Sequence, residues 1–135
     1  MKHIGGNLRS RFIAFLTEDG EKLNRDRDGE FVDDFPPGDA GRDAALHAWG
    51  EGWTALDAAL ALLTDADLTR TVHIRGEPHT IALALARSLA HLAYHQGQIT
   101  LIARIIVGPE RWKVISIARG GTKAHLARMG YEPRR

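Results

Sequence analysis

Apolar residues recur at helical spacing along three stretches of this chain, and polar connections separate them. In the first stretch they step by four, four and three positions, which predicts a helix over residues 2–18. The residues of this stripe are Ile4, Leu8, Phe12 and Phe15. Glycine is unfavourable inside a helix. We therefore expect Gly5 and Gly6 either to permit close approach of a neighbouring helix or to leave room beside His3.

The second stretch covers residues 41–63 and has the clearest pattern, because large apolar residues alternate in steps of three and four. They are Leu46, Trp49, Trp53, Leu56, Leu60 and Leu63. Such a seam is typical of an antiparallel helical bundle. The polar segment before it, residues 21–42, contains the pair Pro36-Pro37 and is interpreted as a long connection.

Residues 70–80 alternate apolar and polar side chains around Gly76, which predicts a short hairpin or extended crossover. Thr80 is placed to cap the helix that follows over residues 81–107. We expect Gly97 to interrupt this helix and Gly108 to end it. A further short helix is predicted in TKAHLARMG. The fold class is therefore all-α with a small hairpin, arranged as a single domain over residues 1–135.

Composition excludes several classes of protein. The chain has 135 residues, a net charge of +1 and no cysteine, so it has neither a disulfide framework nor a thiolate metal site. A balanced charge without a basic recognition helix argues against nucleic-acid binding. No apolar run is long enough to cross a bilayer, and the start MKHIGGNLRS lacks an apolar signal region. We expect a cytoplasmic protein.

The third stretch carries two histidines four positions apart, in HLAYH. His91 and His95 share one helix face, so both can reach one metal ion. His95 also occupies the seam of the predicted helix, where a buried polar group needs a partner. His3 is the third candidate ligand, on another amphipathic helix. Three imidazoles that leave one coordination position open are typical of a catalytic-type divalent metal site.

Other residues fit plainer interpretations. We expect His47 and His125 to lie at the surface, and Trp49 and Trp53 to pack in the core. Arg75 and Arg104 are candidates for binding an anionic substrate. No acid, base or nucleophile is identified by its spacing, so the catalytic residues are left unknown.

Several motifs together resemble the DinB superfamily, and within it the DUF1572 subgroup. They are KHIGGNLRSRF, FLTEDGEK, NRDRDGEF, LTDADLTRTVHIRGEPHT, RSLAHLAYHQGQITLIAR and ISIARG. The resemblance implies a four-helix up-down-down-up bundle with a three-histidine metal site, matching His3, His91 and His95, that holds zinc or nickel. It also implies a small-molecule substrate. Relatives include metal-dependent hydrolases, and transferases and isomerases that use low-molecular-weight thiols such as bacillithiol and mycothiol.

The resemblance implies one more helix before KHIGGN, where this chain begins. Either the start is misassigned or the bundle lacks its first helix. A bundle without that helix would expose its apolar seams, so we expect a homodimer. Two hypotheses stay open. The chain is a metal-dependent transferase or hydrolase, or it is a non-catalytic metal-binding or stress-response bundle.

Overall fold

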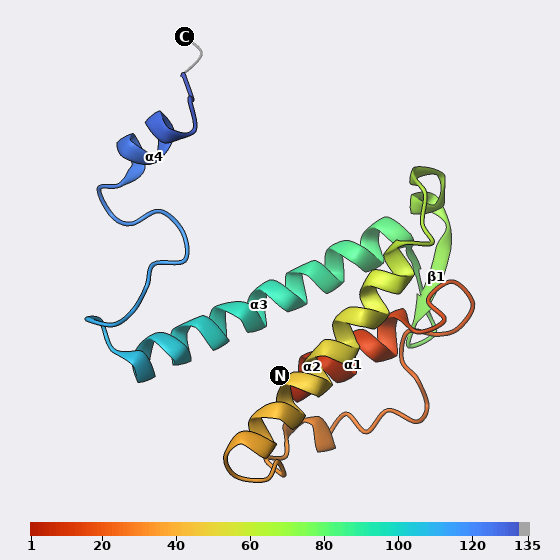
Figure 1. The fold of residues 1–135 in the computed structure, drawn as a ribbon. Coiled ribbons are helices and arrows are strands. Elements are labelled where there is room, and N and C mark those ends of the chain that lie inside the picture. Colours follow the sequence, from red (N-terminus) through yellow and green to blue (C-terminus); the bar gives the residue numbers. More distant parts are fainter. Residues whose placement is uncertain (133–135) are drawn as a thin grey trace. The chain divides into compact units, whose positions relative to one another are not determined.

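The computed structural model describes residues 1–132, and they form two compact units, one covering Met1–Gln96 and one that begins at Gly97. The described chain is mostly helical, with one antiparallel hairpin (Figure 1). Its elements are α1 (Lys2–Phe12), the 3-10 helix η1 (Gly29–Phe31), α2 (Asp39–Leu60), the 3-10 helix η2 (Asp65–Thr69), β1 (Thr71–Ile74), β2 (Glu77–Thr80), α3 (Ile81–Val107) and α4 (Thr122–Arg128). The four-helix DinB arrangement and the single domain stay predictions.

Helix α1 is shorter than the apolar stripe predicts. It ends at Phe12 rather than near residue 18, because Ile13 is extended and Ala14 has a φ of 50°. A left-handed residue cannot continue an α-helix. The turn nevertheless returns Phe15 to the core, where 6% of its surface is exposed. The apolar stripe therefore predicted the buried residues correctly but overestimated the length of the helix.

Helices α1 and α2 cross at a point where neither has room for a side chain. A Cβ on Gly5 would overlap the backbone carbonyl of Ala48, and a Cβ on Gly52 would lie 2.7 Å from the Gly5 Cα. Glycine is needed at such a close approach of two backbones. The expectation that Gly5 admits a neighbouring helix is thus confirmed, and the crossing fixes α1, which carries His3.

The predicted hairpin is present. Thr71 pairs with Thr80 and Ile74 with Glu77, which leaves a two-residue turn. Arg75 and Gly76 both have positive φ, as a type I′ turn requires. The carboxylate of Asp19 accepts hydrogen bonds from both of their backbone N–H groups, at 2.8 and 2.7 Å. This contact ties the segment after α1 to the hairpin.

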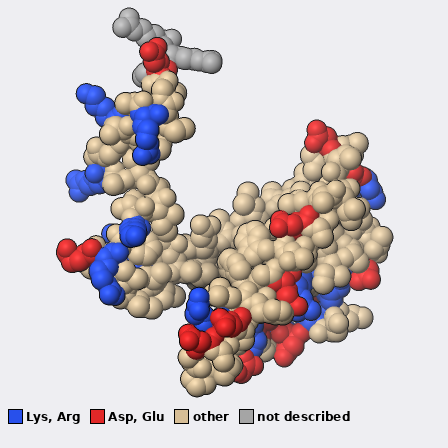
Figure 2. Space-filling view, viewed as in Figure 1, with Lys and Arg blue, Asp and Glu red and all other residues tan. Residues whose placement is uncertain are grey.

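The core of the first unit lies where α1, α2, the hairpin and the start of α3 meet. Its buried apolar members are Ile4, Leu8, Phe12, Phe15, Ala59, Val72, Ile74, Ile81 and Ala84. Trp49, Trp53 and Leu56 from the α2 seam pack against it. Leu46 and Leu60 at the ends of that seam are exposed. Figure 2 shows acidic and basic side chains interspersed over the first unit.

Helix α3 follows its prediction closely. It starts directly after Thr80, whose hydroxyl accepts a hydrogen bond from the Leu83 N–H at 3.2 Å. Gly97 does not interrupt it, contrary to the expectation, because an α-helix tolerates a single glycine at about 1 kcal/mol. Among the described residues, none of the helices is both long and apolar enough to span a bilayer.

Candidate metal centre

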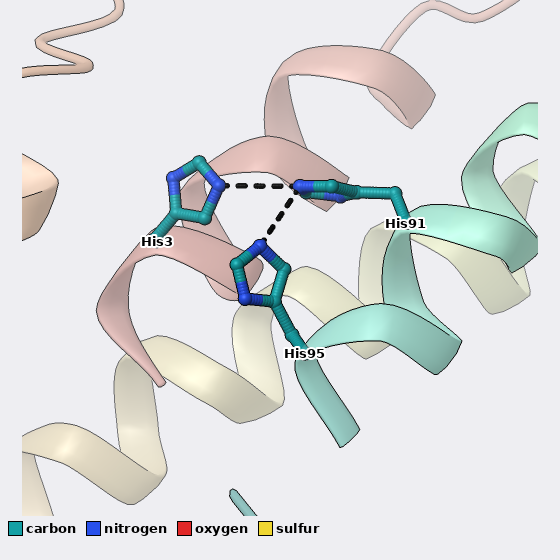
Figure 3. A group of neighbouring side chains, drawn as sticks. All are labelled: His3, His91 and His95. Atoms are coloured by element: carbon teal, nitrogen blue, oxygen red, sulfur yellow. Dashed lines mark hydrogen bonds between the residues drawn. The ribbon is translucent and has the colours of Figure 1, made fainter. Parts of the chain in front are cut away.

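Three histidines from two helices meet in the first unit. His3 comes from α1, and His91 and His95 come from successive turns of α3 (Figure 3). The Nε2 atom of His91 lies 3.3 Å from Nε2 of His3 and 3.1 Å from Nε2 of His95. All three ligand atoms lie within 4.8 Å of one another. The structure thus brings together the three histidines that the sequence singles out, and their binding of a metal stays a prediction.

The spacing of the three nitrogens suits a small cation. Nitrogens bound about 2.0–2.1 Å from a tetrahedral zinc ion lie about 3.3 Å apart. A neutral imidazole nitrogen carries either one hydrogen or one lone pair. Nε2 of His91 can therefore make a hydrogen bond to only one of its two neighbours at a time. A cation would accept all three lone pairs, so the arrangement fits a metal ion better than it fits hydrogen bonding alone.

Glu30 fixes the tautomer of His3. Its carboxylate accepts a hydrogen bond from Nδ1 of His3 at 2.8 Å, which leaves Nε2 without a hydrogen and aimed at the other imidazoles. Arg25 holds the same carboxylate with two hydrogen bonds, of 2.8 and 2.7 Å. A carboxylate behind a histidine is the usual support of a metal-ligating imidazole.

Two neighbours shape the surroundings of His3. A Cβ on Gly6 would overlap the Glu30 carboxylate, so this glycine gives Glu30 its place. The glycine pair therefore also leaves room beside His3, as expected, because Glu30, which contacts His3, fills the space at Gly6. The ring of Phe31 stacks on the imidazole of His3, with centroids 4.5 Å apart. The segment around η1 therefore both orients and covers the first histidine.

Both His3 and His91 are held in the neutral form that binds metals. Burial lowers the pKa of His3 below 6.5, and the hydrogen bond and charge of Glu30 oppose this shift without cancelling it. Burial, together with charge repulsion from His95, His3 and two arginines, lowers the pKa of His91 to about 4. These two imidazoles need not lose a proton before they bind a cation at neutral pH.

A cavity of about 210 Å³ adjoins this cluster and includes His3 and His91 in its wall. Five arginines line it: Arg11, Arg25, Arg27, Arg75 and Arg87. We call it the arginine cavity. A larger cavity of about 490 Å³ has Glu30 and Arg25 in its wall, and its described lining includes no histidine.

The structure also places the other histidines and arginines that the sequence singles out. His47 is exposed, as predicted, while His125 is only partly so. Arg75 lines the arginine cavity, and Arg104 belongs to the second unit. The sequence reasoning missed Glu30 and Arg25. The segment NRDRDGEF contains both residues, but no periodic pattern marks a contact between a loop carboxylate and a histidine 27 positions earlier.

Comparison with known proteins gives one family. The family described as "Protein of unknown function (DUF1572)" matches residues 1–121. No curated protein and no solved structure matches the chain. Function must therefore be argued from the site itself.

Proposed function

The chain belongs to the DUF1572 family, and we propose that its function depends on a divalent metal ion held by His3, His91 and His95. One observation carries the proposal: three Nε2 atoms converge at a spacing suited to one cation, and Glu30 supports the first of them from behind. Structural histidine clusters need neither feature.

Zinc or nickel is the ion that we propose. The chain has no cysteine, and the three ligands that converge are imidazoles, which suit both metals. Three protein ligands leave room for a water or a thiol. A metal ion in such a site lowers the pKa of the bound water or thiol and makes it a nucleophile near neutral pH.

We propose that the chain is a metal-dependent transferase or hydrolase acting on a small molecule. The motifs that resemble the DinB superfamily support this assignment, and so does the cavity beside His3 and His91. The thiol-dependent members of that superfamily make a low-molecular-weight thiol the first co-substrate to test. The role of the chain's own residues would be to bind, orient and desolvate that molecule.

A second candidate is a metal-binding bundle without turnover. The observation that favours it is the absence of Asp and Glu from the described lining of the arginine cavity. Glu30 is close, but Arg25 and His3 occupy its oxygens. A general base would then have to come from elsewhere.

The first experiment is the metal content of the protein, purified without a histidine tag, by elemental mass spectrometry. We expect about one zinc or nickel ion per chain. His95→Ala should lose the metal, and His47→Ala, which changes an exposed histidine on α2, should retain it. The proposal fails if the wild-type chain takes up no metal after incubation with zinc, or if His95→Ala keeps the full amount.

The two candidate functions separate in a screen of electrophiles with and without thiols. An enzyme should give turnover that needs metal and that His95→Ala abolishes. A non-catalytic bundle should bind the metal and give no turnover with any combination. The screen is informative only after the metal content is known.

A further inference from the structure

The arginine cavity carries an excess of positive charge. Glu21 is shared by three guanidinium groups, at 3.1 Å from Arg25, 3.1 Å from Arg75 and 3.6 Å from Arg11. Glu30 pairs with Arg25 and His3. Asp28 lies 3.8 Å from Arg27, but both side chains are largely exposed. The arginines thus outnumber the carboxylates that face them.

Two of these arginines are deeply placed and already oriented. The side chain of Arg11 is 9% exposed and that of Arg25 is 5% exposed. Arg11 also donates a hydrogen bond to the Gly20 carbonyl at 2.8 Å. Burial lowers the pKa of Arg11, Glu21 raises it, and the charges of Arg75, Arg25 and Arg87 lower it further. Arginines are crowded together in this way where a negative ligand can offset their repulsion.

Two largely buried polar side chains in the wall of the arginine cavity are able to bind a ligand. Asn7 is 9% exposed and Ser88 is 8% exposed. Within residues 1–132, neither side chain makes a hydrogen bond to another protein group. Their polar atoms are open to the cavity rather than sealed in the core, because among the described residues only Trp53 Nε1 is a fully buried side-chain polar atom without a hydrogen-bond partner. A ligand in the cavity would supply a partner for Asn7 and Ser88.

We propose that the arginine cavity binds the anionic group, a carboxylate or a phosphate, of the small molecule on which the protein acts. His3 and His91 belong to both the cavity and the histidine cluster, so an anion bound here would lie beside a metal ion held by these histidines. Asn7 and Ser88 donate hydrogen bonds to its oxygens, and the arginines neutralise its charge. The placement of the anion as a substrate handle rests on the proposed function, whereas its binding does not.

The test uses the full chain, freed of metal by a chelator, so that the anion cannot simply bind the metal. Inorganic phosphate and malonate are titrated separately by calorimetry at constant ionic strength. We expect at least one of them to bind with a stoichiometry of one, and the tighter of the two identifies the anionic group. Arg87→Gln should weaken this binding at least about tenfold, because a hydrogen bond to a charged group is lost.

Arg87 suits this variant because it is exposed and its side chain contacts the His79 imidazole rather than the core, so the fold does not depend on it. Asn7→Asp keeps the shape of the side chain but adds a negative charge, and it should abolish binding. Arg42→Gln removes an exposed arginine of α2 outside the cavity and should change nothing. Thermal unfolding confirms that each variant is folded.

The inference is overturned if the wild-type chain binds neither anion, or if Arg87→Gln and Asn7→Asp bind as tightly as the wild type. Equal weakening by Arg42→Gln would also overturn it, because attraction to surface charge would then explain the binding. Metal content is measured on the same proteins before chelation. A metal site without anion binding, or anion binding without a metal site, is therefore recognised separately.

Discussion

Glu30 is the residue on which the environment of His3 depends most. It lies in η1, accepts the Nδ1 hydrogen of His3 and is itself held by Arg25. Its side chain is 8% exposed, so water does not replace it easily. A loop residue thus determines which nitrogen of a helix residue is free to bind.

We expect Glu30→Gln to bind zinc about 10–100-fold more weakly than the wild type, because the amide supports the imidazole less well than a carboxylate does. The affinity is measured by competition with a chromophoric chelator. Glu51→Gln is the matched control, since Glu51 is an exposed residue of α2 that pairs with Arg9. Unchanged affinity in Glu30→Gln would show that the carboxylate does not act through His3.

A second residue-scale prediction concerns Asp67 in η2. Hydrogen bonds from Arg70 and from the side chain and backbone of Thr64 lower the pKa of its carboxyl from 3.8 to about 2. A lowered pKa means that the ionised form stabilises the folded state. This contribution is complete above pH 3.8 and is lost as the pH falls towards 2.

Asp67→Asn should therefore unfold at a lower temperature than the wild type at neutral pH, and the difference should shrink between pH 3.8 and 2. Thermal unfolding followed by circular dichroism across this range gives the result. Asp65→Asn alters the other carboxylate in the first turn of η2 and should leave the neutral-pH midpoint unchanged. A difference between Asp67→Asn and the wild type that does not vary with pH would contradict this assignment.

At the scale of elements, the crossing of α1 and α2 determines where His3 lies. Gly5→Ala should destabilise the first unit by about 1–3 kcal/mol, because its Cβ would push the two backbones apart. Gly50→Ala is the matched control on α2, where a Cβ meets no atom within 4 Å. It should stabilise the helix by up to about 1 kcal/mol. Urea unfolding gives the free energy of unfolding of both variants. If Gly5→Ala is no less stable than Gly50→Ala, the close crossing of α1 and α2 is refuted.

The elements also show what can be inferred from sequence. The hairpin and α3 were predictable because turn chemistry, a capping threonine and an apolar period all agree there. The early end of α1 was not, since Ala14 adopts a left-handed conformation that its residue type does not favour. The histidine pair follows from spacing along one helix, but Glu30 and Arg25 become visible only through tertiary contact.

At the scale of the whole molecule, α3 carries a row of exposed apolar side chains at helical spacing. Ile99, Ile102 and Ile106 follow the seam beyond His95, and 39%, 57% and 75% of their surfaces are exposed. A continuous apolar stripe on a helix usually has a partner. We propose that a second copy of the chain covers this stripe.

We expect analytical ultracentrifugation to give twice the mass of one chain. Ile102→Glu combined with Ile106→Glu should shift the protein to the monomer, because a charge in an apolar interface is strongly unfavourable. Leu83→Glu, at an exposed leucine in the first turn of α3, is the control and should remain dimeric. A wild-type monomer would exclude the homodimer.

The distance along the chain between His3 and His91 has its own consequence. Their Nε2 atoms lie 3.3 Å apart, although the residues are 88 positions apart. An ion bound to both would act as a reversible cross-link in a chain that has no cysteine with which to make a permanent one. Cross-links across long loops restrict the unfolded chain most strongly in the loop-entropy description. The availability of metal in the cell would then set the lifetime of the folded protein as well as its chemistry.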